Sequence, residues 1–134
     1  MFVPGKAGIM FSVTEIDAVR TKQGKAQIYE EVEINEDNCF DETTGVFTAP
    51  YAGAYIFSAR AKSNQRGVKV SSHIMIGKKR HALVQGGHYG KSICSLVHLK
   101  QYQKVWMKAD SPADEYSENW SGNSFYCFLV QADP

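Results

Sequence analysis

The chain has 134 residues, of which 43% are hydrophobic and 22% are charged, and its formal net charge is +1. This length predicts a single domain, and these proportions are ordinary for a globular protein. No apolar run approaches the roughly 18–20 residues of a membrane-spanning helix. The amino terminus lacks the basic start, apolar core and cleavage site of a secretory signal, so we expect either a cytosolic protein or a removed leader.

The three cysteines, Cys39, Cys94 and Cys127, exclude a disulfide-dense scaffold, because they allow at most one intramolecular bridge. They form no CxxC pair. We therefore expect free thiols buried in a packed core.

Charged residues are segregated along the chain. Nine acidic and three basic residues lie between Glu15 and Glu42, and eleven basic residues with no acidic one lie between Arg60 and Lys108. Five acidic residues and no basic one follow from Asp110. Either these charges interleave and balance on the folded surface, or the basic block forms a face for an anionic partner.

The dominant period of the sequence is two, which is typical of strands with one buried face. Such strands are predicted, in chain order, at 27–34, 46–48, 55–62, 68–76 and 93–99. Two further runs, 105–107 and 125–130, are apolar throughout and predict short strands buried on both faces. Turn residues separate the runs, and no segment has a sustained 3.6-residue period. The sequence therefore predicts an all-β sandwich or barrel.

The stretch FDETTGVFTAPYAGAYIF, residues 40–57, combines aromatic rings with turn residues at regular intervals. Asp41 and Gly45 suit a turn, because Asp bonds its own downstream backbone and Gly takes the left-handed conformation. Pro50 ends the strand that follows, and Gly53 permits a bend before a long central strand. Core packing is the default role of these rings, since each buries on the order of 150–250 Å².

The ordered spacing F-D-x-x-T-G-x-F-T-A-P-x-x-G-x-Y-x-F closely resembles the central signature of the complement C1q globular-head family. Four other segments follow the family order: the first strand at 10–13, a hairpin at 74–79, the late L-x-x-G-D-x-V-W-L segment at 99–107 and the closing strand at 124–130. Tyr102-Gln103 replaces the usual Gly-Asp, and Cys127 replaces a glycine. The chain resembles a divergent member, closer to standalone invertebrate proteins than to the complement subunits.

The resemblance implies a ten-stranded jelly-roll sandwich, shared with the tumour-necrosis-factor family, that assembles as a homotrimer. It implies a globular domain at 10–134, and we expect a flexible leader at 1–9. Tyr55, Phe57 and Phe128 are candidates for the trimer interface by resemblance, and burial inside the protomer is the alternative for each of them.

Enzyme chemistry is not expected. The sequence has no GxSxG elbow, no HExxH motif and no phosphate-binding glycine loop. Its four histidines do not share a metal-ligand spacing.

Two loop regions are predicted as recognition surfaces instead. The first places clustered cations on a hairpin tip and on an adjacent loop, where they suit carboxylate, sulfate or phosphate groups. Its candidate residues are Lys78, Lys79, Arg80, His81, His88 and Tyr89. The second is the acidic loop 110–121, in which Tyr116, Asn119 and Trp120 suit a sugar ring. Its oxygen-rich composition also suits Ca²⁺, although the spacing fits no EF-hand. Solvated loops are the alternative for both.

The leading functional hypothesis is a secreted, trimeric, lectin-like pattern-recognition receptor of innate immunity. It would bind sialylated or sulfated glycans or lipopolysaccharide, with no nucleic-acid partner and no membrane insertion. One alternative is a secreted ligand for a cell-surface receptor, as cerebellin-like and adiponectin-like relatives are. Another is the structural head of a protein with a collagen-like or coiled-coil stalk.

Overall fold

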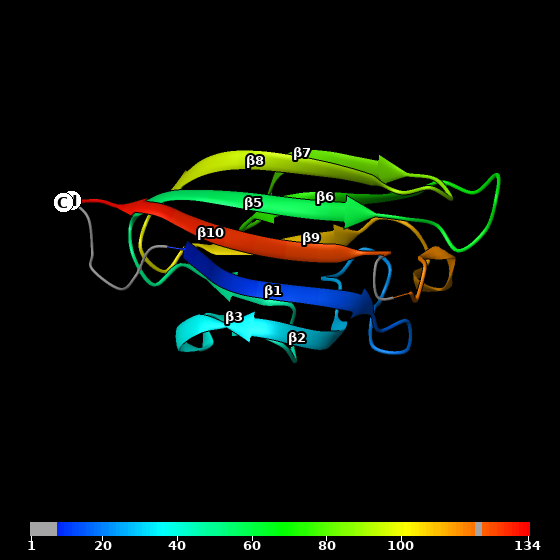
Figure 1. Cartoon of the computed structure of the whole chain (residues 1–134), viewed down its shortest axis with the longest axis horizontal. Helices are drawn as coiled ribbons and strands as arrows, with labels where there is room; N and C mark the ends of the chain where they lie inside the picture. Colours follow the sequence, from blue (N-terminus) through cyan, green and yellow to red (C-terminus); the bar gives the residue numbers. More distant parts are fainter. Residues whose placement is uncertain (1–7, 120–121) are drawn as a thin grey trace.

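The computed structural model describes residues 8–119 and 122–134, which form two antiparallel five-stranded sheets packed face to face (Figure 1). Sheet A has the strand order β2-β1-β10-β5-β8 and sheet B the order β3-β4-β9-β6-β7. The strands are β1 (Gly8–Ile16), β2 (Tyr29–Asn35), β3 (Phe40–Asp41), β4 (Val46–Thr48), β5 (Gly53–Ala61), β6 (Val70–Ile76), β7 (Lys79–Gly86), β8 (Lys91–Leu99), β9 (Lys104–Ala109) and β10 (Ser124–Ala132). Two short 3-10 helices, η1 (Glu36–Asn38) and η2 (Ala113–Glu115), interrupt the loops. The predicted ten-stranded jelly-roll sandwich is confirmed.

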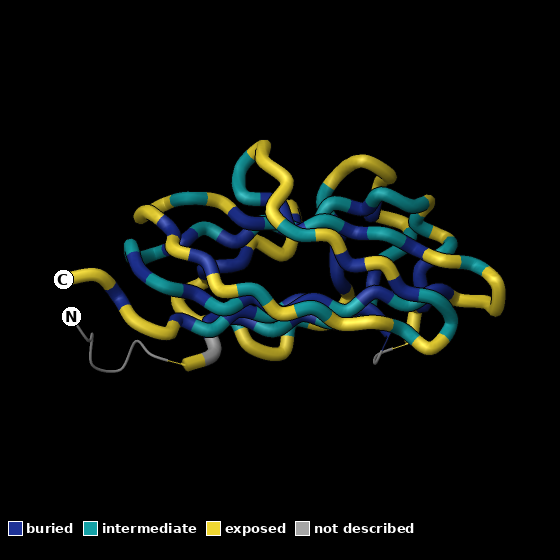
Figure 2. The backbone as a smooth tube through the Cα atoms, turned by 90° about the horizontal axis from the view of Figure 1, so that it is seen from above, coloured by how far each residue is buried: buried dark blue, intermediate teal, exposed yellow. Residues whose placement is uncertain are grey.

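Central strand β5 shows how the sequence period selects the buried face. Tyr55, Phe57, Ala59 and Ala61 are buried, whereas Ile56 and the other residues of opposite parity face outward, except that Ser58 is also nearly covered. Figure 2 shows buried and exposed residues alternating along the strands. β5 pairs with β10 on one side and β8 on the other, so segments far apart in the sequence share its face.

The core between the sheets is an aromatic cluster. Phe47 of sheet B lies 5.2 Å from Phe11 and 5.7 Å from both Tyr55 and Phe57, measured between ring centroids. Phe125 stacks on Phe57 at 5.9 Å. These centroid distances fall in the range in which tilted and stacked ring pairs attract one another. The aromatic rings of the 40–57 stretch therefore hold the two sheets together.

The turn predicted between Asp41 and Gly45 is confirmed. The Asp41 carboxylate accepts the backbone N–H of Thr43 at 2.9 Å, and Gly45 has a φ of +74°. A Cβ at Gly45 would lie 2.3 Å from the carbonyl oxygen of Gln27. Only glycine therefore fits this turn, which approaches the backbone of the loop before β2.

Three details differ from expectation. β1 begins at Gly8, because Gly8 already pairs with Leu129, so the expected leader at 1–9 overlaps the sheet; residues 1–7 lie outside the described residues. β10 is buried on one face only, since Val130 is 47% exposed. Cys94 is an exposed thiol on the outward face of β8, whereas Cys39 and Cys127 are buried as predicted. Within the described chain, no helix is long and apolar enough to cross a membrane.

Buried thiol and tyrosine hydroxyl groups make the stability of the fold depend on alkaline pH. Burial raises the pKa of the Cys39 thiol to about 12 and that of the Tyr55 hydroxyl to about 12, from ordinary values of 9.0 and 10.0. Burial also raises the pKa of Tyr29 and Cys127. Above the ordinary values the unfolded chain binds fewer protons than the folded one, so the free energy of unfolding falls as pH rises.

We expect the free energy of unfolding to be at its full value below about pH 9 and to decrease by several kcal/mol by about pH 11. Urea denaturation across this range measures the change. A free energy of unfolding that stays constant up to pH 11 would contradict the burial of these groups.

Candidate recognition surfaces

The β6–β7 turn at Gly77 and Lys78 is held against the outward face of sheet B. The Trp106 indole Nε1–H donates to the Gly77 carbonyl oxygen at 2.9 Å, and the Gly77 N–H donates to the Lys104 carbonyl oxygen at 2.7 Å. Gly77 has a φ of +60°, which suits glycine in a two-residue turn. A rigid strand, β9, therefore positions this basic turn.

The cations of the turn do not form one cluster. Lys78, Lys79 and Arg80 are exposed. Arg80 pairs with Met75 on the outward face of sheet B, whereas the His81 Nε2 contacts the Ser95 Oγ of β8 at 2.6 Å. The pairing register shifts between Ile74 and Met75, and this bulge turns His81 toward sheet A. His81 therefore points away from Arg80. Lys79, which pairs with Ile76, also has the parity opposite to that of Arg80.

The loop carrying His88 and Tyr89 lies at the opposite end of the sandwich from the basic turn. The two are joined by the eight residues of β7, which span about 26 Å. The expectation that they form adjacent loops is therefore wrong, because the intervening segment is a strand. Tyr89 is 81% exposed, and Arg60 fixes the loop by donating to the Tyr89 carbonyl oxygen at 3.0 Å.

The acidic loop after β9 lies at the same end as Tyr89. Its Ser117 N–H donates to the Lys62 carbonyl oxygen at 2.9 Å, and the neighbouring Ser63 N–H donates to the Gly87 carbonyl oxygen at 3.0 Å. Asn119 is exposed. Trp120 lies outside the described residues.

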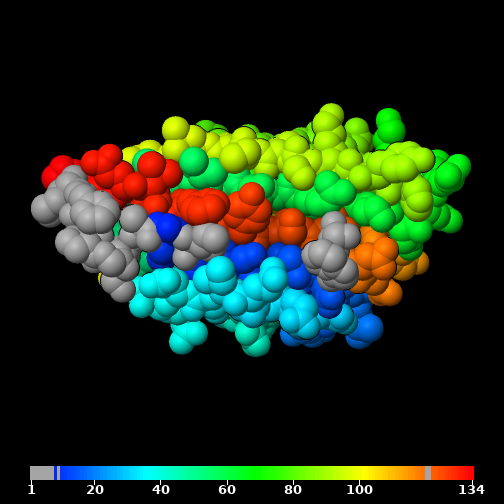
Figure 3. All heavy atoms as spheres, viewed as in Figure 1, coloured from blue at the N-terminus to red at the C-terminus, as the bar shows by residue number. Residues whose placement is uncertain are grey.

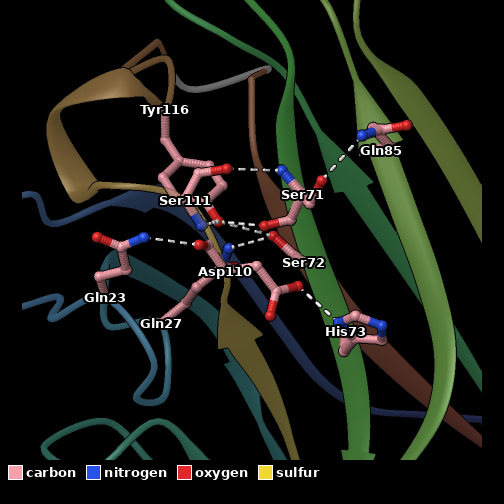
Figure 4. A network of polar contacts seen from close by, with 9 residues as sticks. All are labelled: Gln23, Gln27, Ser71, Ser72, His73, Gln85, Asp110, Ser111 and Tyr116. Carbon is pink, nitrogen blue, oxygen red and sulfur yellow. Dashed lines mark hydrogen bonds and ion pairs between the residues drawn. The ribbon is translucent and has the colours of Figure 1, made fainter.

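Tyr116 is an anchor of this loop, which corrects its prediction as a ligand-binding residue. Its side chain is fully buried, and its hydroxyl donates to the Ser71 carbonyl oxygen and accepts from the Ser72 Oγ at 3.2 Å. Figure 4 shows this hydroxyl in a polar network that joins β6 to the start of the loop. A buried tyrosine hydroxyl needs such partners, so its aromatic ring is not available to a sugar.

Two further contacts pin the start of the loop. The His73 Nδ1 lies 2.6 Å from the Asp110 carboxylate, and the Gln23 side-chain amide donates to the Asp110 carbonyl oxygen at 2.9 Å (Figure 4). Asp110 is thus engaged with protein groups. Among the residues that the structure describes, no three His, Cys, Asp or Glu side chains gather into a group suited to a metal ion.

The outward face of sheet A carries an apolar surface of which only Phe128 was expected from the sequence. Along one row Phe128 pairs with Ile56, which pairs with Leu96; along the next, Tyr126 pairs with Ser58, which pairs with Cys94. Leu96 is 66% exposed, and a hollow of about 490 Å³ lies between these strands. Figure 3 views this face from the front, with β10 running between β1 and β5. The sequence signal for this surface is the alternation along β5 and β8, which places Ile56 and Leu96 on the outward face.

Of the three interface candidates, only Phe128 lies on this face. Phe128 is partly exposed and points outward. Tyr55 and Phe57 have no exposed surface in the single protomer, because their parity on β5 directs them into the aromatic core. These two residues are therefore removed from the candidate interface.

Opposite charges gather at the two lateral edges of the sandwich. Figure 1 shows β2 and β3 together at one edge and β7 and β8 at the other. The first edge carries exposed acidic residues, namely Glu30, Glu31, Glu33, Glu36, Asp37 and Glu42. The second carries exposed basic residues, namely Lys69, Lys79, Arg80 and Lys91. The segregation noted in the sequence is thus kept in space.

Comparison with known proteins agrees with this architecture. A family profile described as the C1q domain matches residues 10–130. The chain belongs to the C1q domain family. Members of this family are non-enzymatic ligand or recognition proteins, which confirms the prediction that this protein is not an enzyme.

Two curated relatives are similar over most of this chain. Protein HP-25 homolog 1 of Bos taurus is 29% identical over 109 residues, covering 79% of this chain and 51% of the relative. Hibernation-associated plasma protein HP-20 of Tamias sibiricus is 31% identical over 108 residues, covering 78% of this chain and 55% of the relative. The C1q-domain chain thus spans about half the length of these relatives.

Solved structures share the fold at low sequence identity. The globular domain of zebrafish complement 1qA protein matches with a TM-score of 0.67 and 15% identity, over 96% of this chain and 99% of that one. Murine APRIL matches with a TM-score of 0.67 and 9% identity, over 93% and 100%. These likenesses establish the C1q and tumour-necrosis-factor-like fold.

Proposed function

We propose that this C1q domain is the recognition head of an extracellular protein, that it assembles as a homotrimer, and that it binds anionic glycans. The observation that carries the assembly is the apolar outward face of sheet A, with Leu96 beside Ile56 and Phe128. Contiguous apolar patches on single protomers usually mark a contact surface. The plasma location in the name of one relative supports an extracellular protein.

The charged edges support a cyclic assembly. In a ring, each protomer contacts its neighbours through two different surfaces. The acidic edge at β2 and β3 complements Lys69 and Lys91, which lie at the end of the basic edge away from the turn. This pairing favours head-to-tail contacts, opposes contacts between like edges and leaves Lys79 and Arg80 free for a ligand. The number three is taken from the family resemblance.

The basic turn supports the choice of an anionic ligand. Lys78, Lys79 and Arg80 are exposed at a turn that Trp106 holds in place. Arginine and lysine bind sulfate, carboxylate and phosphate groups through charge-assisted hydrogen bonds. Three copies of a weak site gain avidity on a dense ligand, as on a microbial surface or a sulfated matrix. This is the lectin-like, pattern-recognition form of the proposal.

We expect Lys79→Ala combined with Arg80→Ala to weaken binding to acidic glycans by roughly tenfold without changing the assembly mass. The measurement is a glycan and lipopolysaccharide array at low and physiological salt, with Ca²⁺ and with a chelator. Lys22→Ala with Lys100→Ala removes the same charge from other exposed sites and serves as the control. Equal binding by both double variants would exclude the basic turn. No binding by the unmodified protein would favour a receptor ligand instead.

A further inference from the structure

The outward face of sheet B carries an aromatic and cationic surface centred on Trp106. Across the sheet, Val46 of β4 pairs with Trp106 of β9, Trp106 pairs with Met75 of β6, and Met75 pairs with Arg80 of β7. All four residues have the parity that points away from the aromatic core. This row is the middle of the surface.

Trp106 is held in a fixed position. The hydrogen bond from its Nε1–H to the Gly77 carbonyl oxygen orients the indole toward the β6–β7 turn. Met75, its partner in the ladder, is only 5% exposed. Trp106 itself is partly exposed. Because an ordered ring loses little conformational freedom on binding, it is a suitable platform for a sugar ring.

Cations surround this ring on three sides. Lys104 and Lys108 lie two residues before and after Trp106 on β9, so their Cα atoms are each about 7 Å from it on the same face. Arg80 lies two strands away, at about 10 Å. The ion pairs found among the described residues involve Arg20, His73 and His98, and none involves these three cations.

Two carboxylates lie near this surface, and each contacts protein groups. Asp41 pairs with Val46 at the end of the Trp106 row, and its carboxylate accepts the Thr43 N–H and hydroxyl. Asp110 lies beyond Lys108 and contacts His73. Lys104 donates to the Thr48 hydroxyl at 3.2 Å, which orders its side chain without neutralising it. Three cations against two carboxylates leave the surface with a net positive charge around an aromatic centre.

We propose that this face binds a sulfated polysaccharide, with Trp106 contacting a sugar ring and Lys104, Lys108 and Arg80 contacting sulfate groups. The inference rests on the proposed function and names its ligand class and main surface. The outward faces of the two sheets lie on opposite sides of the sandwich. The Trp106 surface therefore stays accessible when the outward face of sheet A is covered. The row of residues crosses four strands, an extent that suits an extended polymer rather than a small ion.

The test uses the tryptophan fluorescence of the full chain. The protein has two tryptophans, so Trp120→Phe leaves Trp106 as the sole reporter. We expect dextran sulfate to shift Trp106 emission saturably and neutral dextran to leave it unchanged. In that background, Lys104→Ala with Lys108→Ala should weaken dextran sulfate binding by roughly tenfold. The control, Lys22→Ala with Lys100→Ala, should bind like the parent, and thermal melting verifies that all variants fold.

The outcomes separate this inference from the proposed function. If the protein binds acidic glycans but the Lys104 and Lys108 variant is unaffected, the surface is wrong and the recognition function stands. Trp106 emission that is unchanged at saturation also overturns the surface. Failure of the unmodified protein to bind any sulfated glycan overturns both. Binding to anionic phospholipid vesicles but not to dextran sulfate would assign the face to a membrane surface instead.

Discussion

Leu96→Glu is expected to convert the proposed homotrimer into a monomer at micromolar concentration. Leu96 is 66% exposed in the protomer and lies beside Ile56 and Phe128 on the outward face of sheet A. A carboxylate enclosed there without a partner costs several kcal/mol, and a ring of three protomers encloses three of them. The free protomer tolerates the change, because the side chain stays in water.

Sedimentation velocity measures this directly, with the 15.0 kDa chain as the monomer reference. Val19→Glu is the matched control, since Val19 is an exposed apolar residue in the loop between β1 and β2 and acquires the same charge. We expect the control to keep the mass of the unmodified protein. A Leu96→Glu protein that also keeps that mass would place the association surface elsewhere.

Phe47→Ala is expected to destabilise the protomer by about 3–5 kcal/mol, the usual cost of emptying a buried aromatic site. Phe47 comes from the three-residue strand β4 and contacts the rings of Phe11, Tyr55 and Phe57, all on sheet A. Its removal leaves a cavity between the sheets rather than at their edge. Such a loss is a large fraction of the total stability of a domain of this size.

Urea denaturation of the monomeric Leu96→Glu protein isolates this effect from changes in assembly. The comparison is Tyr89→Ala, which deletes a similar ring from an exposed loop and should change the free energy of unfolding by less than about 0.5 kcal/mol. Similar losses in the two variants would mean that Phe47 does not connect the sheets.

The alternation of residues along β5 separates the core from the apolar outward face of sheet A. The alternation along β5 places Tyr55 and Phe57 on the face opposite to Arg60 and Lys62, which predicts burial inside the protomer. The family resemblance suggests an interface role for both residues, and the structure places them in the core instead. The same alternation identifies Ile56 as outward-facing.

The relative positions of the loops could not be predicted from the sequence. His88 and Tyr89 follow the basic turn closely in sequence, yet β7 carries them to the other end of the sandwich, beside the acidic loop. The run 79–86 has a weak apolar alternation because it is an edge strand. The outward face of sheet B is another example. It brings together residues of two strands, β9 and β7, because both pair with β6. These residues are Lys104, Trp106, Lys108 and Arg80.

The all-β class, the core strands, the turn at Asp41 to Gly45 and the family follow from the amino-acid sequence alone. These properties depend on local periodicity and on residue types at fixed spacing. The three-dimensional structure is needed to establish which loops share an end, which charges share an edge and which side chains share a face. Those properties depend on strand lengths, on bulges and on pairings between distant segments, and no local pattern records them.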